Sequence, residues 1–207
     1  MSAERLAIVA GSGPDLWSEL QDAQRCAPGA ELIAVNLTGL FLPRVRHLVS
    51  LHPELLGPLR ALRLSCDWVD AASEREQRPP VTHSREQRTP GGAQLVWDGV
   101  DHHWPLSPQG RGGTSALFAV WVALEHLGYD RVILAGVPLD GSRRFFDPPH
   151  TAPWRGAADP RGLGALSMDR GPWEEAARTW FSGRVRSCSS WTGALLGRPD
   201  VLQEAIA

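Results

Sequence analysis

The chain has 207 residues, enough for one α/β domain with a sizeable core, and its formal net charge of −2 gives no overall attraction to nucleic acid or to an anionic membrane. All 21 basic residues are arginine, which excludes lysine chemistry such as a Schiff base or the lysine of a phosphate-binding loop. The three cysteines are odd in number and far apart, so we expect reduced thiols in a cytoplasmic protein. The N-terminus has too short an apolar run for a signal peptide, and no stretch approaches the roughly 20 apolar residues of a membrane span.

The first strand that the sequence predicts is Leu6–Ala10, which leads into Gly11-Ser12-Gly13 and then a helix from about residue 16 to 25. A strand, a glycine turn and a helix in this order are typical of a dinucleotide-binding loop, where backbone N–H groups bind a phosphate. The third glycine of that fingerprint is Leu16 here, so the motif alone is weak.

Two further strands are predicted at residues 31–35 and 46–51, and a helix follows from about residue 54 to 64. Asn36 comes directly after the first of these strands and His52 after the second, as Ser12 does after the N-terminal strand. Ligands of open parallel sheets bind beyond the carboxyl ends of the strands. Three polar residues at three successive strand ends therefore favour a shared polar crevice.

The middle of the chain predicts irregular structure. Residues 66–69 suit a short strand, and residues 72–92 are polar and rich in proline, which indicates an exposed loop or a lid with a minor strand at Val81-Thr82. We expect another strand at residues 93–97. It is followed by Asp98, Asp101 and two adjacent histidines, whose spacing matches no familiar zinc pattern. A magnesium or manganese site through Asp98 and Asp101 stays open if a substrate brings phosphates.

The stretch Gly110–Asp140 predicts a glycine-rich loop, a buried helix and a buried strand. Thr114 or Ser115 can cap the helix, and Gly113 lets the chain pass close to a ligand. The helix is apolar on nearly all sides from residue 116 to 127, which indicates that other elements cover it. Gly128 ends it, and the aliphatic run Arg131–Ala135 is typical of a parallel strand buried on both faces.

The loop after that strand should hang over the same crevice. Arg143 and Arg144 can neutralise phosphate charge with directional hydrogen bonds, and His150 has the right pKa for a proton acceptor. Residues 151–172 predict irregular chain or a lid. A helix should begin at Pro172 and run to about residue 182, followed by a strand at 184–188 and a short helix at 191–196. We expect residues 1–207 to form one Rossmann-like α/β domain, with a mostly parallel sheet flanked by helices.

Read together, these motifs resemble the small bacterial sialyltransferases, which have a single Rossmann-like domain, and their relatives with an archaeal-type pterin pyrophosphokinase-like domain. The chain also resembles short proteins of phage genomes, which leaves a phage-encoded member of this family open. GSGPD at Gly11–Asp15 matches the family's GNGPS, Asn36 matches its nucleotide-binding asparagine, and Thr114-Ser115-Ala116 matches its TSG motif. The segment Val132–Asp140 aligns with its strand and GID loop, and RVRSCSSWTGALLG with its last strand and serine-rich turn.

The chain departs from the family pattern at several positions. Pro138 replaces the carboxylate of the GID motif, and His52 replaces a second asparagine. The family's paired tyrosines have no counterpart, so Arg143 and Arg144 would hold the leaving phosphate instead. His150 falls roughly where the family has its catalytic histidine.

The resemblance implies a nucleotide-dependent transferase, and a glycosyltransferase with a nucleotide-sugar donor is the leading hypothesis. His150 would be catalytic, Arg143 and Arg144 would bind the leaving phosphate, and no metal or cofactor would be required. The nucleotide-binding residues would be Gly11, Ser12, Gly13, Asn36, His52, Gly113, Thr114 and Ser115. The acceptor is undetermined and includes a small molecule, a glycan or modified DNA.

Two alternatives stay open. One is pyrophosphoryl transfer from ATP, with magnesium held by Asp98, Asp101 or Asp140. The other is a non-catalytic nucleotide-binding protein, for which the altered GID motif and the missing tyrosines argue. The chain has nine tryptophans, an unusually high number, which is compatible with a surface that binds a partner or a second copy of the chain.

Overall fold

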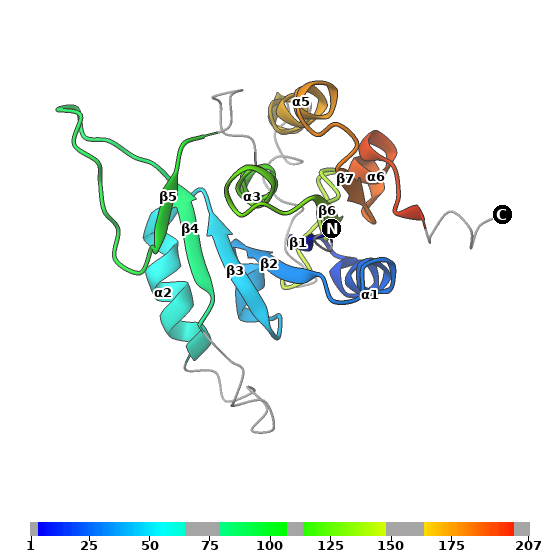
Figure 1. The fold of residues 1–207 in the computed structure, drawn as a ribbon, viewed down its shortest axis with the longest axis horizontal. Helices are drawn as coiled ribbons and strands as arrows, with labels where there is room; N and C mark the ends of the chain where they lie inside the picture. Colours follow the sequence, from blue (N-terminus) through cyan, green and yellow to red (C-terminus); the bar gives the residue numbers. More distant parts are fainter. Residues whose placement is uncertain (1–3, 65–78, 107–113, 148–163, 201–207) are drawn as a thin grey trace.

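The computed structural model describes residues 4–64, 79–106, 114–147 and 164–200. Seven strands form one sheet in the order β5-β4-β3-β2-β1-β6-β7, and every neighbouring pair is parallel (Figure 1). The strands are β1 Leu6–Ala10, β2 Glu31–Val35, β3 Val45–Ser50, β4 Val81–Arg85, β5 His102–Trp104, β6 Arg131–Ala135 and β7 Val185–Ser187. The predicted Rossmann-like α/β fold is therefore confirmed.

Helices cover both faces of the sheet (Figure 1). On one face lie α1 (Leu16–Cys26) and α2 (Pro53–Leu64), whereas α3 (Ser115–Trp121) and α5 (Gly164–Thr179) lie on the other. The helix α3 continues as a π-helical turn, η3 (Val122–His126), and Gly128 follows with the positive φ of a helix end. The remaining elements are the 3₁₀ turn η1 (Asn36–Leu40) and α6 (Ser190–Leu196), which packs on β7. Within the described part of the chain, no helix is long and apolar enough to cross a membrane.

The order in which the chain adds strands to the sheet reverses at β1. The chain proceeds outward from β1 to β5, and α3 then carries it back to β6 on the other side of β1. All the strands are parallel, so the loops that follow β1 and β6 leave the same edge of the sheet. The connection after β1 leads to one half of the sheet and the connection after β6 leads to the other, which leaves a gap between the two loops. This topological switch point is where open α/β sheets bind ligands.

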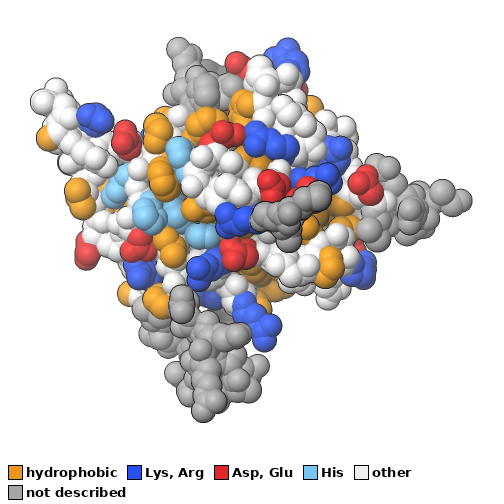
Figure 2. Space-filling view, viewed as in Figure 1, with side chains coloured by type: hydrophobic (Ala, Val, Ile, Leu, Met, Phe, Trp, Pro, Cys, Tyr) orange, Lys and Arg blue, Asp and Glu red, His pale blue; other side chains and the backbone are white. Residues whose placement is uncertain are grey.

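The β5 edge of the sheet differs from the sequence prediction. Residues 93–97 do not form a strand: they belong to a loop with one antiparallel bridge between Arg88 and Gln94, and Val96 is 83% exposed. The edge strand beside β4 is β5 instead. Asp101, the residue before β5, accepts hydrogen bonds from both the N–H and the hydroxyl of Thr82 on β4 and so joins the two strands. The predicted minor strand is confirmed as β4, which is buried, so this part of residues 72–92 is not an exposed loop. Figure 2 shows histidine side chains gathered over this side of the molecule.

The start of α5 also differs from the sequence prediction. Residues 164–172 were expected to be irregular, yet α5 begins at Gly164 and contains Pro172 in its interior. Proline marks the first turn of a helix by preference only, and here Trp173 is buried without solvent exposure and fixes the helix by packing. The predicted strand at residues 66–69 lies outside the described residues.

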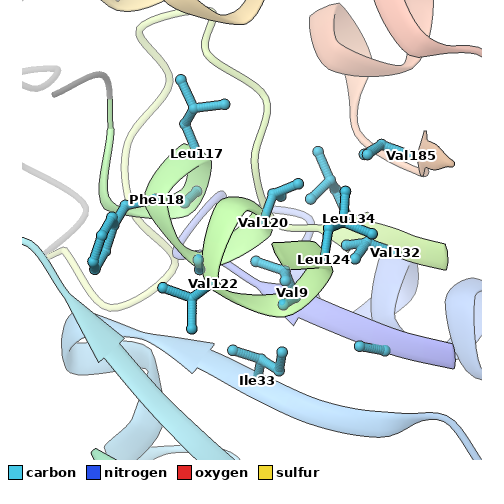
Figure 3. Close-up of a cluster of buried hydrophobic side chains, with 14 of the residues drawn as sticks. Val9, Ile33, Leu117, Phe118, Val120, Val122, Leu124, Val132, Leu134 and Val185 are labelled. Atoms are coloured by element: carbon cyan, nitrogen blue, oxygen red, sulfur yellow. The ribbon is translucent and has the colours of Figure 1, made fainter. Parts of the chain in front are cut away.

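The core surrounds α3, as the apolar character of that helix predicted. Alternate residues of β1 point to opposite faces, so Val9 packs with α3 while Ile8 packs with α1. Leu117, Val120 and their buried neighbours on α3 meet β1, β2 and β6 in one cluster (Figure 3). Burial on both faces explains why the central strands are continuous aliphatic runs rather than alternating ones.

Candidate functional site

A pocket with a volume of about 490 Å³ opens at the carboxyl ends of β1, β2, β3 and β6. Its position coincides with the switch point of the sheet. The polar and charged residues of its lining are Ser12, Asn36, His52, Thr114, Ser115, Asp140, Ser142, Arg143, Arg144 and Asp169. Its apolar wall includes Leu37 and Leu55, which are 37% and 41% exposed and offer a surface for a flat ring.

The glycine loop after β1 packs against the loop after β6. Gly11 donates its N–H to the carbonyl of Ala135 at 2.8 Å, and Gly13 donates to Gly136 at 2.7 Å. A Cβ on Gly11 would lie 2.5 Å from the Gly136 oxygen, which explains why the chain has glycine there. These two N–H groups are consequently engaged inside the protein, and of the predicted GSG loop only Ser12 keeps a polar side chain for a ligand.

Asn36 is held by a hydroxyl from the next strand. Ser50 is fully buried, and its Oγ accepts a hydrogen bond from the N–H of His52 at 2.9 Å. The hydroxyl proton therefore goes to Asn36 Oδ1, at 2.6 Å. With Oδ1 engaged, the Asn36 amide offers its Nδ2 as a hydrogen-bond donor at the pocket. Asn36 adopts a left-handed backbone (φ 52°), which asparagine tolerates better than most residues.

The predicted helix cap is confirmed at Thr114. Its Oγ1 accepts from the N–H of Leu117 at 3.2 Å and also from Nε1 of Trp173 on α5, at 3.2 Å. Because both acceptor positions are used, the Thr114 hydroxyl keeps its proton for a ligand. The neighbouring Ser115 accepts from the N–H of Leu51 and so joins α3 to the end of β3.

The loop that carries the two arginines is anchored by aromatic rings. Phe146 stacks on Phe41 with a centroid distance of 5.5 Å, and Phe145 contacts Phe41 and Trp17 edge to face. The guanidinium of Arg144 lies 5.7 Å from the Phe146 ring centroid. This packing holds the loop beside the pocket and places positive charge there.

Asp140 begins this loop and accepts a hydrogen bond on each of its two carboxylate oxygens. One carboxylate oxygen accepts from the N–H of Ser142 at 2.9 Å and the other from Ser190 Oγ at 2.8 Å. Burial disfavours its ionisation, but these hydrogen bonds prevail and hold the pKa of Asp140 below its ordinary value. Asp140 is therefore a fixed negative charge whose oxygens are already engaged.

A half-buried carboxylate on α1 supports the loop from the side opposite the pocket lining. Glu19 of α1 accepts from the N–H of Gly136 at 2.6 Å and from the hydroxyl of Ser189. Ser189 Oγ in turn accepts from the N–H of Val137 at 2.8 Å, and Thr192 donates to the Val137 carbonyl at 2.7 Å. The serine-rich turn after β7 thus shapes the β6 loop rather than contacting a ligand.

Asp169 contributes a second carboxylate to the pocket, from α5. Burial raises the pKa of Asp169 above its ordinary value, and no hydrogen bond opposes the shift. No sequence motif indicated Asp169 as a site residue, because residues 151–172 were expected to be irregular. A helical register over residues 164–179 would have been the signal that placed it.

The structure brings nine predicted site residues to this pocket: Gly11, Ser12, Gly13, Asn36, His52, Thr114, Ser115, Arg143 and Arg144. Gly113 and His150 lie outside the described residues, so their predicted roles stay predictions. Asp98 and Asp101 do not line the pocket. Asp101 instead pairs with Arg60 at 3.0 Å, and no cluster of metal-ligand side chains occurs among the residues described.

Comparisons with known proteins found no matching family model, no similar curated protein and no similar solved structure.

Proposed function

We propose that the protein is a nucleotide-dependent transferase that binds a nucleotide sugar in the pocket at the switch point of its sheet. The observation that carries this proposal is the convergence of polar residues from four strand ends on one pocket. The resemblance of the sequence motifs to those of the small bacterial sialyltransferases supports it, since Ser12, Asn36 and Thr114 match positions that bind the nucleotide in that family.

The lining suits the parts of a nucleotide sugar. Leu37 and Leu55 flank Asn36 and His52 along the chain and offer an apolar surface to the base, while the Asn36 amide donates to its polar edge or to the ribose. Arg143 and Arg144 would stabilise the negative charge that develops on the leaving phosphate, a contribution that is usually large in such reactions. The sequence predicts His150 as a proton acceptor, and that role stays a prediction because His150 lies outside the described residues.

Binding is tested by the unfolding temperature with CMP, UDP, GDP, ADP and representative sugars of each. Stabilisation by one base family supports the proposal and identifies the donor, because a ligand of the folded state at 100 times its Kd contributes about 2.7 kcal/mol. No shift with any nucleotide contradicts it.

Turnover separates the alternatives. Release of free nucleotide from the stabilising nucleotide sugar supports the transferase. Formation of AMP from ATP, strictly dependent on a divalent ion, would indicate pyrophosphoryl transfer instead. Asp140 is the carboxylate of the magnesium alternative that lies at the pocket, and both its oxygens already accept hydrogen bonds. Binding without either reaction would indicate a non-catalytic nucleotide-binding protein.

A further inference from the structure

Asp169 differs from the other carboxylates at or beside the pocket because it is unpaired. Both oxygens of Asp140 accept hydrogen bonds, and Glu54 lies 3.4 Å from Nδ1 of His52. Among the described residues, the Asp169 carboxylate has neither a hydrogen bond nor an ion pair. The residue nevertheless lines the pocket, and its side chain is partly buried. An unpaired, partly buried carboxylate costs stability, and such groups cluster at functional sites.

Two neighbours on α5 fix the position of Asp169. Arg170 donates through Nε to the carbonyl of Leu139 at 2.9 Å and lies over the ring of Trp191. Trp173, one helical turn beyond Asp169, donates through Nε1 to Thr114 Oγ1 at 3.2 Å. Residues four apart lie on the same side of a helix, so Asp169 shares the side by which Trp173 meets Thr114 at the pocket wall.

We propose that Asp169 is the catalytic residue that takes the proton from the acceptor hydroxyl when a glycosyl group is transferred in this pocket. This inference rests on the proposed function. As the acceptor oxygen bonds to the anomeric carbon, its proton moves to a carboxylate oxygen of Asp169. The bond between the anomeric carbon and the phosphate oxygen breaks, and its electron pair leaves with the nucleotide, next to Arg143 and Arg144.

The surroundings suit this role. The charged and titratable groups on the other walls of the pocket are His52, Asp140, Arg143 and Arg144, and Arg170 on the same helix is occupied by Leu139 and Trp191. Burial raises the pKa of Asp169, which makes its carboxylate a stronger base than an exposed one.

The test compares Asp169→Asn with Glu174→Gln, an exposed carboxylate on the same helix. The probes are CMP-N-acetylneuraminic acid, UDP-glucose, UDP-N-acetylglucosamine, GDP-mannose and ADP-glucose, with water as the acceptor and release of free nucleotide as the readout. Loss of a general base slows catalysis by about 100-fold or more, so Asp169→Asn should lose that much while the nucleotide still raises the unfolding temperature. Glu174→Gln should match the wild-type protein on both readouts.

Other results overturn the inference. Turnover by Asp169→Asn within about threefold of the wild-type rate, or a 100-fold loss in His52→Gln or His150→Ala with Asp169→Asn spared, assigns the proton to another group. If Asp169→Asn does not fold, the wild-type rate decides, measured only at those pH values from 7 to 4 at which circular dichroism shows the protein still folded: the inference requires the rate to fall with an acid limb above the ordinary aspartate pKa, and a flat profile excludes it. Wild-type turnover that Asp169→Asn retains refutes the inference alone, whereas nucleotide binding without turnover of any probe, or no nucleotide binding at all, refutes the proposed function as well.

Discussion

Nδ1 of His47 on β3 lies 2.9 Å from Nε2 of His83 on β4, inside the protein. Trp104 donates through Nε1 to Nδ1 of His83 at 3.1 Å, so the His83 proton must reside on Nε2 and be donated to His47. His47 in turn carries its proton on Nε2, which faces Glu31 at 3.9 Å. Three side chains are thereby locked in one tautomeric arrangement in which both histidines are neutral.

This pair predicts destabilisation in mild acid. Burial lowers the pKa of His47 from 6.5 to about 4 and that of His83 to about 3. The unfolded chain therefore takes up both protons near pH 6.5 while the folded protein does not. Stability is complete above pH 6.5 and should fall below it, with a slope approaching about 1.4 kcal/mol per pH unit for each histidine.

The measurement is the urea midpoint at pH 7.5, 6.0 and 5.0. The other charges that act on the pair are Glu31, Arg5, Arg46, Asp101, His102 and His126. His52→Gln removes an exposed histidine and should leave the decline unchanged. A midpoint that stays constant down to pH 5.0 contradicts the prediction.

Gly11→Ala should destabilise the protein by about 1–3 kcal/mol, since its Cβ would lie 2.5 Å from the Gly136 oxygen and 2.8 Å from Val137. Gly171→Ala is the control: no atom lies within 4 Å of the added Cβ in α5, so it should gain up to about 1 kcal/mol. Free energies of unfolding in urea measure both. Equal stabilities of the two variants would show that the β1 and β6 loops are not in contact.

Ser50→Ala should lower nucleotide affinity about tenfold, a change of about 1.4 kcal/mol, because the Asn36 amide loses the hydroxyl that orients it. The N–H of His52 also loses its partner, so stability should drop by about 1–3 kcal/mol. Calorimetric titration with the stabilising nucleotide measures the affinity, and the exposed Ser18→Ala on α1 is the matched control. Unaltered affinity in Ser50→Ala would exclude Asn36 as a contact of the nucleotide.

Arg143→Gln and Arg144→Gln should each weaken binding of the nucleoside diphosphate by about tenfold or more while hardly affecting the nucleoside, since arginine contributes mainly through the phosphates. Arg88→Gln removes the same charge from a loop away from the pocket and should bind both ligands as the wild-type protein does. Equal losses for the nucleoside and the diphosphate would mean that the arginines shape the pocket without meeting phosphate.

The sequence alone determined the α/β class and most strand positions, because strands buried on both faces must be continuous aliphatic runs, as Leu6–Ala10 and Arg131–Ala135 are. It also located Ser12, Asn36 and His52 at strand ends, where parallel topology brings side chains together. Local patterns failed at residues 93–97, because an apolar run forms a strand only where a sheet edge receives it.

Only the tertiary structure decided the features that depend on partners distant in the chain. Glu19 meets Gly136 across 117 residues, and His47 meets His83 across 36. Asp169 joins the pocket because α5 packs Trp173 against Thr114, and no pattern around residue 169 indicates that contact. The role of the glycine loop between β1 and α1 likewise differs from the predicted one. The sequence of the loop predicted phosphate contacts through N–H groups, yet Gly11 donates to Ala135 at the end of β6 and Gly13 donates to Gly136 directly after it, since the two segments approach too closely for a residue with a Cβ.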